Sequence, residues 1–211
     1  MKFPTDPIHA YSAEMTSPQS ELLSYIEKQT YLKTIDPFNL SGHLQGRVLS
    51  AISHMIRPQR ILEVGTFTAY SAICLAEGLP SEGELYTIEI NPEMEYLIKN
   101  HLERAPQKDQ IRYRIGNAIE LIPSLAGAFD LIFIDAAKRE YEAYYELCLG
   151  RLQQGGFLLI DNVLWKGKIL QKKKDPRTKS LDAFNLMLRN DDRVENVLLP
   201  MTDGLQIVRK R

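Results

Sequence analysis

Two carboxylates and a carboxamide stand where two apolar segments of the sequence end. Asp135 follows the run that closes with Phe133-Ile134, and Asp161 and Asn162 follow the run 157–160. If the two runs are neighbouring strands of a parallel sheet, their carboxyl ends meet at one edge and bring the three side chains together. Oxygen ligands of this kind suit Mg²⁺, Mn²⁺ or Ca²⁺ and leave positions for water or substrate. The sequence therefore predicts a divalent cation site at this edge.

Two of these residues also have a purely structural interpretation, because Asp135 and Asn162 are residue types that cap helices. Asp161 is harder to explain in that way. It continues an apolar run, and a buried carboxylate without a partner is costly. Lys138, three residues after Asp135, is expected to face the same edge, where its amine could accept a proton.

A second group of polar residues surrounds the segment 61–71, which is typical of a strand, a tight turn and the start of a helix. Gly65 lets the backbone approach a ligand at the carboxyl edge of the sheet, and Thr66 and Ser71 lie in the same turn. The turn lacks the G-x-G-x-x-G pattern of dinucleotide-binding proteins, and Glu63 would repel a pyrophosphate. An acidic residue suits instead the ammonium and sulfonium of S-adenosylmethionine (SAM).

The next two strand ends could complete a nucleoside site. Glu89 ends the second strand-like run, where a carboxylate can accept both hydroxyls of a ribose; the alternative is a surface acid at a helix start. Ala118 follows the third run, where backbone groups could meet an adenine edge. The residues expected to bind SAM are therefore Glu63, Gly65, Thr66, Ser71, Glu89, Ala118 and Asp135.

The elements that must position these residues alternate along the chain. Strand-like runs are expected at 60–64, 84–90, 111–115, 130–134 and 156–160, separated by helices near 70–78, 92–104, 117–125 and 139–152. This alternation predicts a parallel sheet covered on both faces. A helix near 181–189 then precedes two runs, 194–199 and 205–208, joined by Thr202-Asp203-Gly204, which predicts an antiparallel hairpin.

These elements predict a fold and a division of the chain. The expected fold class is α/β: a Rossmann-like class I methyltransferase fold with a seven-stranded, mostly parallel sheet, a C-terminal antiparallel hairpin and helices on both faces. Helical patterns near 18–34 and 41–55 predict an N-terminal extension, residues 1–58, packed on a SAM-binding core, residues 59–211. We expect the two parts to form a single structural domain.

The composition is that of an ordinary globular domain, with 44% hydrophobic and 25% charged residues among 211. Cys74 and Cys148 stand in apolar helical patterns and are expected to be small buried hydrophobes. No run of eighteen apolar residues predicts a transmembrane helix, and the polar, proline-broken opening 1–7 is unlike a signal peptide. We therefore expect a cytoplasmic protein without a membrane partner.

Four motifs together resemble one known family. They are Leu62-Glu63-Val64-Gly65 with Tyr70-Ser71, Asp135-Ala136-Ala137-Lys138, Ile160-Asp161-Asn162-Val163-Leu164-Trp165-x-Gly167, and Leu199-Pro200-x-x-Asp203-Gly204-Leu205. Over about residues 40–211 the chain resembles the cation-dependent O-methyltransferases, which include catechol and caffeoyl-coenzyme A O-methyltransferases. It departs from them at Ala69, where the family usually has glycine, and at Ala137, where many members have aspartate.

The resemblance implies roles for the residues singled out above. SAM would be the methyl donor, and a divalent cation, Mg²⁺ first among the candidates, would bind Asp135, Asp161 and Asn162. Lys138 would act as base beside Asp135. The acceptor would be a small phenol or a coenzyme A-linked one, and the protein would be a homodimer. Ser41, His43 and Trp165 are candidates to line the acceptor site, although a histidine at a helix start is often a surface residue.

A basic segment leaves a further alternative open. Residues 166–179 could form a solvated loop or clamp an anionic partner, either a coenzyme A thioester or RNA. The basic residues are Lys166, Lys168, Lys172, Lys173, Lys174, Arg177 and Lys179. The RNA interpretation corresponds to a tRNA-modifying methyltransferase acting on a hydroxylated wobble uridine. A non-catalytic SAM- or nucleotide-binding module and an NAD-dependent oxidoreductase are the remaining, less favoured classes.

Overall fold

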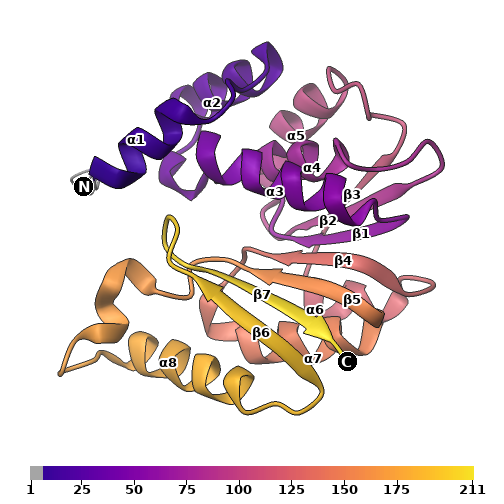
Figure 1. Cartoon of the computed structure of the whole chain (residues 1–211). Coiled ribbons are helices and arrows are strands. Elements are labelled where there is room, and N and C mark those ends of the chain that lie inside the picture. Colours follow the sequence, from indigo (N-terminus) through magenta and orange to yellow (C-terminus); the bar gives the residue numbers. More distant parts are fainter. Residues whose placement is uncertain (1–6) are drawn as a thin grey trace.

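The structure, a computed structural model, describes residues 7–211 and centres on a seven-stranded sheet of order β3-β2-β1-β4-β5-β7-β6 (Figure 1). The first five strands pair in parallel, and β7 pairs antiparallel with β5 and β6. This confirms the predicted mostly parallel sheet with its C-terminal hairpin. The strands are β1 (Arg60–Val64), β2 (Glu84–Glu89), β3 (Ile111–Ile115), β4 (Phe129–Ile134), β5 (Leu152–Ile160), β6 (Val194–Leu199) and β7 (Leu205–Lys210).

Helices cover both faces of the sheet, as Figure 1 shows. The buried apolar side chains form two clusters, one under α2 to α5 and one under α6 to α8. The α-helices are α1 (Pro7–Met15), α2 (Glu21–Lys33), α3 (Gly42–Ile56), α4 (Tyr70–Ala76), α5 (Glu95–Leu102), α6 (Ala118–Leu121), α7 (Tyr141–Arg151) and α8 (Pro176–Arg189). Short 3₁₀ helices are η1 (Pro37–Asn39), η2 (Pro92–Met94), η3 (Ile122–Ser124), η4 (Lys138–Glu140) and η5 (Trp165–Leu170).

The register of the central strands brings the candidate site together. Val64 of β1 pairs with Ile134 of β4, which pairs in turn with Ile160 of β5. One residue further on, the Asp135 N–H donates to the Val64 carbonyl (2.9 Å) and the Asp161 N–H to the Ile134 carbonyl (3.0 Å). The backbone ladder therefore places Asp135 and Asp161 side by side at the carboxyl edge.

Several elements differ from the sequence expectations at their ends. The helix expected over 117–125 is a single turn followed by η3, because Pro123 cannot donate the next helical hydrogen bond. Helix α8 begins at Pro176 rather than 181, because Asp175 caps it by accepting the Thr178 N–H (2.8 Å). Strand β5 begins at Leu152, four residues before the expected start.

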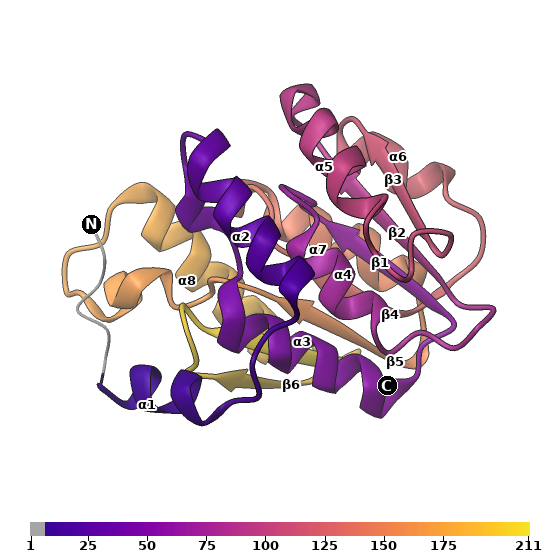
Figure 2. The same ribbon diagram turned by 90° about the horizontal axis from the view of Figure 1, so that it is seen from above.

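The N-terminal helices pack on the rest of the chain. Helices α2 and α3 contact α4, and Figure 2 shows them lying along that side of the sheet. The expected division into an extension (1–58) and a core (59–211) stays a prediction, and residues 1–6, with most of the polar opening, lie outside the described residues. In residues 7–211 no helix combines the length and apolar character needed to cross a membrane. Cys74 and Cys148 are buried free thiols, as expected.

Candidate active site

A cavity of about 1490 Å³ opens at the carboxyl ends of the strands. It collects strand ends, the turn after β1, and residues of α1 and η1. The predicted site residues that line it are Ser41, Gly65, Thr66, Ser71, Glu89, Ala118, Asp135, Lys138, Asp161, Asn162 and Trp165. Segments more than a hundred residues apart in the sequence thus face one space.

Asp161 lines this cavity, and the two oxygens of its carboxylate differ in their surroundings. The side chain is buried, and its Oδ2 accepts hydrogen bonds from Gln45 Nε2 (2.7 Å) and Asn162 Nδ2 (3.1 Å). Its Oδ1 is buried without a hydrogen-bond partner among the described residues. Burial, with the nearby charge of Asp135, raises the pKa of Asp161 well above its usual range. Among the described residues no cationic side chain forms a salt bridge with this carboxylate, although the charge of Lys138 is near enough to lower its pKa in part.

The other carboxylate of the pair is held by a lysine. Lys138 Nζ donates to Asp135 Oδ1 at 2.9 Å, and the same ammonium lies 5.8 Å from the centre of the Tyr141 ring. Lys138 sits at the start of η4, three residues after Asp135, which is why both side chains reach the same rim. The side-chain nitrogen of Lys138 is thus paired with one of the two carboxylates at this edge.

The donor set fits a hard divalent cation. No group of three or more His, Cys, Asp or Glu side chains in residues 7–211 is arranged to hold a metal ion, so a cation here would depend on the carboxamide as its third ligand. With Nδ2 of Asn162 turned toward Asp161, its amide oxygen is left for another partner. Asp161 Oδ1, orphaned and buried, is the atom that a cation would satisfy, and the oxygen ligands match Mg²⁺, Mn²⁺ or Ca²⁺.

The turn between β1 and α4 has the shape of a ligand cradle. Gly65 has φ +105°, and a Cβ there would lie 2.1 Å from the Asp135 carbonyl oxygen, so the position accepts only glycine. The carboxylate of Glu89 organises the turn by accepting the N–H of Phe67 (2.7 Å) and of Asn91 (2.9 Å). Ala69, the departure from the family pattern, takes the left-handed conformation (φ +67°) that favours glycine.

Glu63 lies beneath this turn and does not line the cavity, because it is fully buried. Thr87 donates to its Oε2 (2.5 Å), and Thr66 in turn contacts the Thr87 hydroxyl. Its Oε1 is buried without a hydrogen-bond partner in the described structure. Burial, reinforced by the charges of Asp135 and Glu89, raises the pKa of Glu63 to about 8.

Three residues at the site were not among the predicted ones. Gln45 reaches Asp161 from α3 and accepts a hydrogen bond from Thr202 Oγ1 (3.1 Å), so it connects the helical extension to the β6–β7 loop. The Tyr141 hydroxyl donates to the Asp161 carbonyl (2.8 Å). The carboxylate of Asp203, which accepts a backbone N–H, lines the cavity, and burial raises its pKa.

Of the three candidates for the acceptor site, His43 lies elsewhere. It does not line the cavity; its Nε2 lies 2.8 Å from the Ser17 carbonyl and ties the α1–α2 connection to α3. Ser41 and Trp165 do line the cavity, beside apolar side chains of the rim. The spacing of Ser41 and His43 in the sequence does not show which of them faces the cavity at the start of α3.

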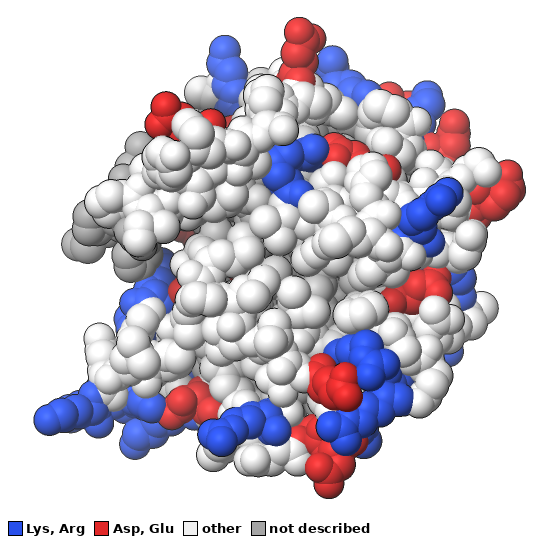
Figure 3. Space-filling view, in the orientation of Figure 1, with Lys and Arg blue, Asp and Glu red and all other residues white. Residues whose placement is uncertain are grey.

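The basic segment forms η5, the following loop and the start of α8. Lys174 pairs with Asp182, and Lys168 Nζ lies 5.7 Å from the centre of the Trp165 ring. Lys172 and Lys173 are exposed. Figure 3 shows Lys and Arg side chains gathered over this part of the molecule, at the lower left.

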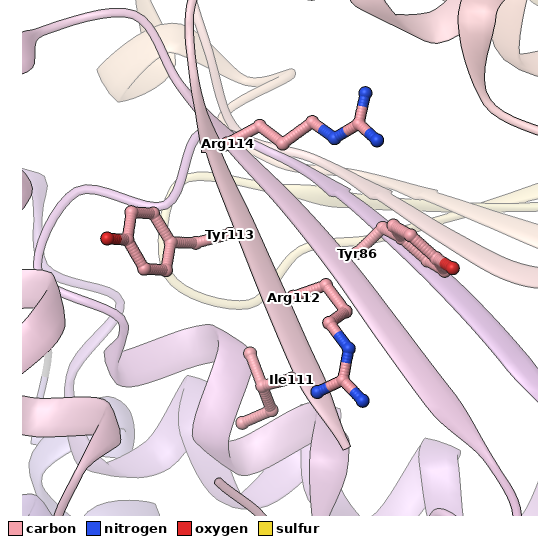
Figure 4. Close-up of a pocket in the computed structure, with 5 residues that line it drawn as sticks. All are labelled: Tyr86, Ile111, Arg112, Tyr113 and Arg114. Carbon is pink, nitrogen blue, oxygen red and sulfur yellow. The ribbon is translucent and has the colours of Figure 1, made fainter. Parts of the chain in front are cut away.

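A second hollow, of about 410 Å³, lies at the sheet edge formed by β3 (Figure 4). In Figure 4 the side chain of Tyr113 points away from those of Arg112 and Arg114, as alternation along a strand requires. The lining residues are Tyr86, Ile111, Arg112, Tyr113 and Arg114. None of them is a carboxylate, a histidine or a cysteine, so the chemistry belongs to the larger cavity.

Comparison with known proteins agrees with this geometry. A family model described as O-methyltransferase matches residues 11–211. The catechol O-methyltransferase domain-containing protein 1 of Mus musculus is 36% identical over 174 residues, which cover 79% of this chain and 66% of that protein. The catechol O-methyltransferase of Niastella koreensis is 35% identical over 162 residues, covering 74% of this chain and 73% of that protein.

The fold has a matching solved structure. The methyltransferase PaMTH1 of Podospora anserina, bound to S-adenosylhomocysteine (SAH), superposes with a TM-score of 0.90 at 28% identity, covering 100% of this chain and 98% of that one. The resemblance drawn from the four motifs is thereby confirmed, as is the class I methyltransferase fold. The chain belongs to the O-methyltransferase family, as a SAM-dependent enzyme.

Proposed function

We propose that this enzyme methylates a hydroxyl of a small catechol-like or phenolic acceptor and that a divalent cation, Mg²⁺ first, assists it. The single observation that carries the proposal is the buried Oδ1 of Asp161, which has no hydrogen-bond partner within residues 7–211, beside Asp135 and Asn162 at the large cavity. The relative from Niastella koreensis, a catechol O-methyltransferase, supports an acceptor of this class.

The chain's own residues supply the proton chemistry. A phenol has a pKa of about 10, so little phenolate exists at neutral pH without help. A divalent cation held by Asp135, Asp161 and Asn162 would stabilise the phenolate and orient its oxygen. Lys138 Nζ, 2.9 Å from Asp135 Oδ1, would take the hydroxyl proton in its neutral amine form. The oxygen–carbon bond to the methyl group forms as the carbon–sulfur bond breaks, which leaves a neutral thioether.

The opposite side of the cavity holds the donor. We assign the ribose hydroxyls to Glu89, whose two oxygens each accept one backbone N–H and keep further lone pairs for a ligand. Glu63 attracts the cationic methionine end from beneath the turn, with Gly65, Thr66 and Ser71 around it. Ala118 meets the adenine, and Asp135 stands between donor and acceptor.

Donor-side binding is expected to strengthen as the pH rises from 6 to 8. In the free protein burial holds the pKa of Glu63 at about 8, so the carboxyl is largely neutral below that value. The ammonium of the ligand, which SAH shares with SAM, favours the ionised form of Glu63, so binding releases a proton and the affinity falls by up to about tenfold for each pH unit below 8. Calorimetric titration with SAH at pH 6, 7 and 8 measures this slope.

The matched control is Glu63→Gln, which keeps the size of the side chain and removes the titration. Its affinity for SAH should be weaker and nearly independent of pH over this range. The assignment is wrong if Glu63→Gln keeps the slope of the natural protein, because another group would then be responsible.

The acceptor and the cation are tested in one assay. We expect SAH production with catechols, expect EDTA to abolish it, and expect Mg²⁺ added in excess to restore it. Coenzyme A esters of hydroxycinnamic acids and tRNA carrying an unmethylated hydroxyuridine are the parallel arms. Full activity on a catechol in EDTA would contradict the cation, and activity on tRNA alone would contradict the small acceptor.

A further inference from the structure

Three fully buried polar residues meet at the β1–α4 turn, one of which, Thr68, belongs to the wall of the cavity. They are Thr30 of α2, Thr68 of the turn and His101 of α5, each with an exposed fraction of 0%. The hydroxyls of Thr30 and Thr68 lie 2.9 Å apart, and His101 Nδ1 lies 2.8 Å from the Thr68 carbonyl oxygen. We call this group the Thr68 clasp. None of its members takes part in the chemistry described above.

The hydrogens of the clasp can be assigned from its partners. The Thr30 hydroxyl donates to the Ile26 carbonyl (2.8 Å), so in the pair of hydroxyls Thr68 is the donor. A carbonyl only accepts, so Nδ1 of His101 carries the hydrogen. Its Nε2, buried and without a partner in the described structure, is then the bare nitrogen of a neutral ring. Burial lowers the pKa of His101, in agreement with this assignment.

The clasp acts on a backbone that needs support. The neighbours of Thr68 in the turn, Phe67 (φ +49°) and Ala69 (φ +67°), are both in the left-handed region. Residues other than glycine keep such conformations where the surrounding structure fixes them. Glu89 fixes the Phe67 N–H, and the clasp fixes both the hydroxyl and the carbonyl of Thr68.

We propose that Thr30 and His101 are positioning residues that hold the turn 65–69 in the shape that binds the methyl donor. The N-terminal helix α2, which packs against α4, thereby contributes to donor affinity through the hydrogen bond between Thr30 and Thr68. The inference rests on the proposed donor site and adds the elements that shape it.

The direct test is Thr30→Val, which replaces the hydroxyl by a methyl group of similar size. It removes the acceptor of Thr68, and we expect SAH affinity to fall about tenfold, the effect of one buried hydrogen bond left unmade. The KM for SAM should rise by a similar factor, while kcat at saturating SAM and the KM of the acceptor stay unchanged. Calorimetry with SAH and initial rates measure the two effects separately.

Thr34→Val is the matched control, one helical turn further on. The Thr34 hydroxyl makes the same kind of bond, to the Thr30 carbonyl (2.8 Å), at the end of the same helix, and lies outside the clasp. SAH affinity should be unchanged. Equal losses of affinity in Thr30→Val and Thr34→Val would overturn the proposal, because a general loosening of α2 would explain both.

His101 is tested by a pair of variants. His101→Leu removes the donor to the Thr68 carbonyl and should weaken SAH binding, whereas His101→Asn keeps an N–H near that point and should restore part of it. A lower melting temperature with unchanged SAH affinity in both Thr30→Val and His101→Leu would overturn the proposal. Glu89→Gln distinguishes a failure of the proposed donor site from a failure of the clasp proposal. If Glu89→Gln leaves SAH affinity unchanged, the donor site is assigned to the wrong place. If Glu89→Gln weakens SAH binding and Thr30→Val does not, only the role of the clasp is wrong.

Discussion

Asp161→Asn is expected to lower kcat/KM by about 10²- to 10⁴-fold, since a cation at the reacting oxygen contributes several kcal/mol. The amide keeps an oxygen toward Gln45 Nε2 and Asn162 Nδ2, so the position of the side chain is retained. What it loses is the negative Oδ1, the atom without a partner. Methyl transfer to a catechol at saturating SAM measures the loss, and titration with Mn²⁺ followed by electron paramagnetic resonance measures cation affinity directly.

The same substitution should stabilise the cation-free protein. A buried carboxylate with an unsatisfied oxygen is costly, so replacing it with a neutral amide should raise the free energy of unfolding in EDTA by about 1–3 kcal/mol. The control is Asp191→Asn. Asp191 is paired with Arg193 and accepts the Tyr145 hydroxyl (2.8 Å), and these partners lower its pKa, so its neutralisation should destabilise the fold and spare cation binding. If Asp161→Asn bound the cation as tightly as the natural protein does, the proposed cation site would be wrong.

The sheet and its functional edge could be predicted because both depend on local patterns. Apolar runs with a polar residue directly after them, as in Ile134-Asp135 and Ile160-Asp161, define where parallel strands end. Topology then brings those ends together regardless of the distance in sequence. The ends of the helices were harder to predict. Helix α8 begins several residues earlier than expected, because Asp175 caps it.

The contacts that shape the site from outside the strand ends could not be predicted in this way. Gln45 and Asp161 are 116 positions apart, and no pattern in the sequence predicts their hydrogen bond. The same holds for Thr30 with Thr68, where a threonine on an amphipathic helix has no feature that marks it as buried. The position of the His43 side chain could not be predicted for a related reason, because its partner is the carbonyl of Ser17 in a neighbouring segment.

Lys138→Met is expected to lower kcat by about 10²- to 10⁴-fold, the usual contribution of a positioned proton acceptor. Cation affinity should change in the opposite direction. Lys138 Nζ occupies Asp135 Oδ1 at 2.9 Å, so removing the ammonium frees that oxygen and takes away a competing positive charge. A merely structural role would lower both quantities together. Lys99→Met is the matched control, because Lys99 makes a similar pair with Glu95 (3.0 Å) on an exposed helix surface.

Lys138→Arg separates proton transfer from charge. A guanidinium keeps the positive charge beside Asp135 but does not give up its proton at any pH that the enzyme meets, so it cannot take one from the acceptor. If Lys138 accepts the proton, the arginine variant should be nearly as slow as Lys138→Met. An arginine variant that kept most of the natural kcat would show that Lys138 acts through its charge alone. The proton would then have to leave by another route, for which the half-buried carboxylate of Asp203 on the cavity wall is a candidate.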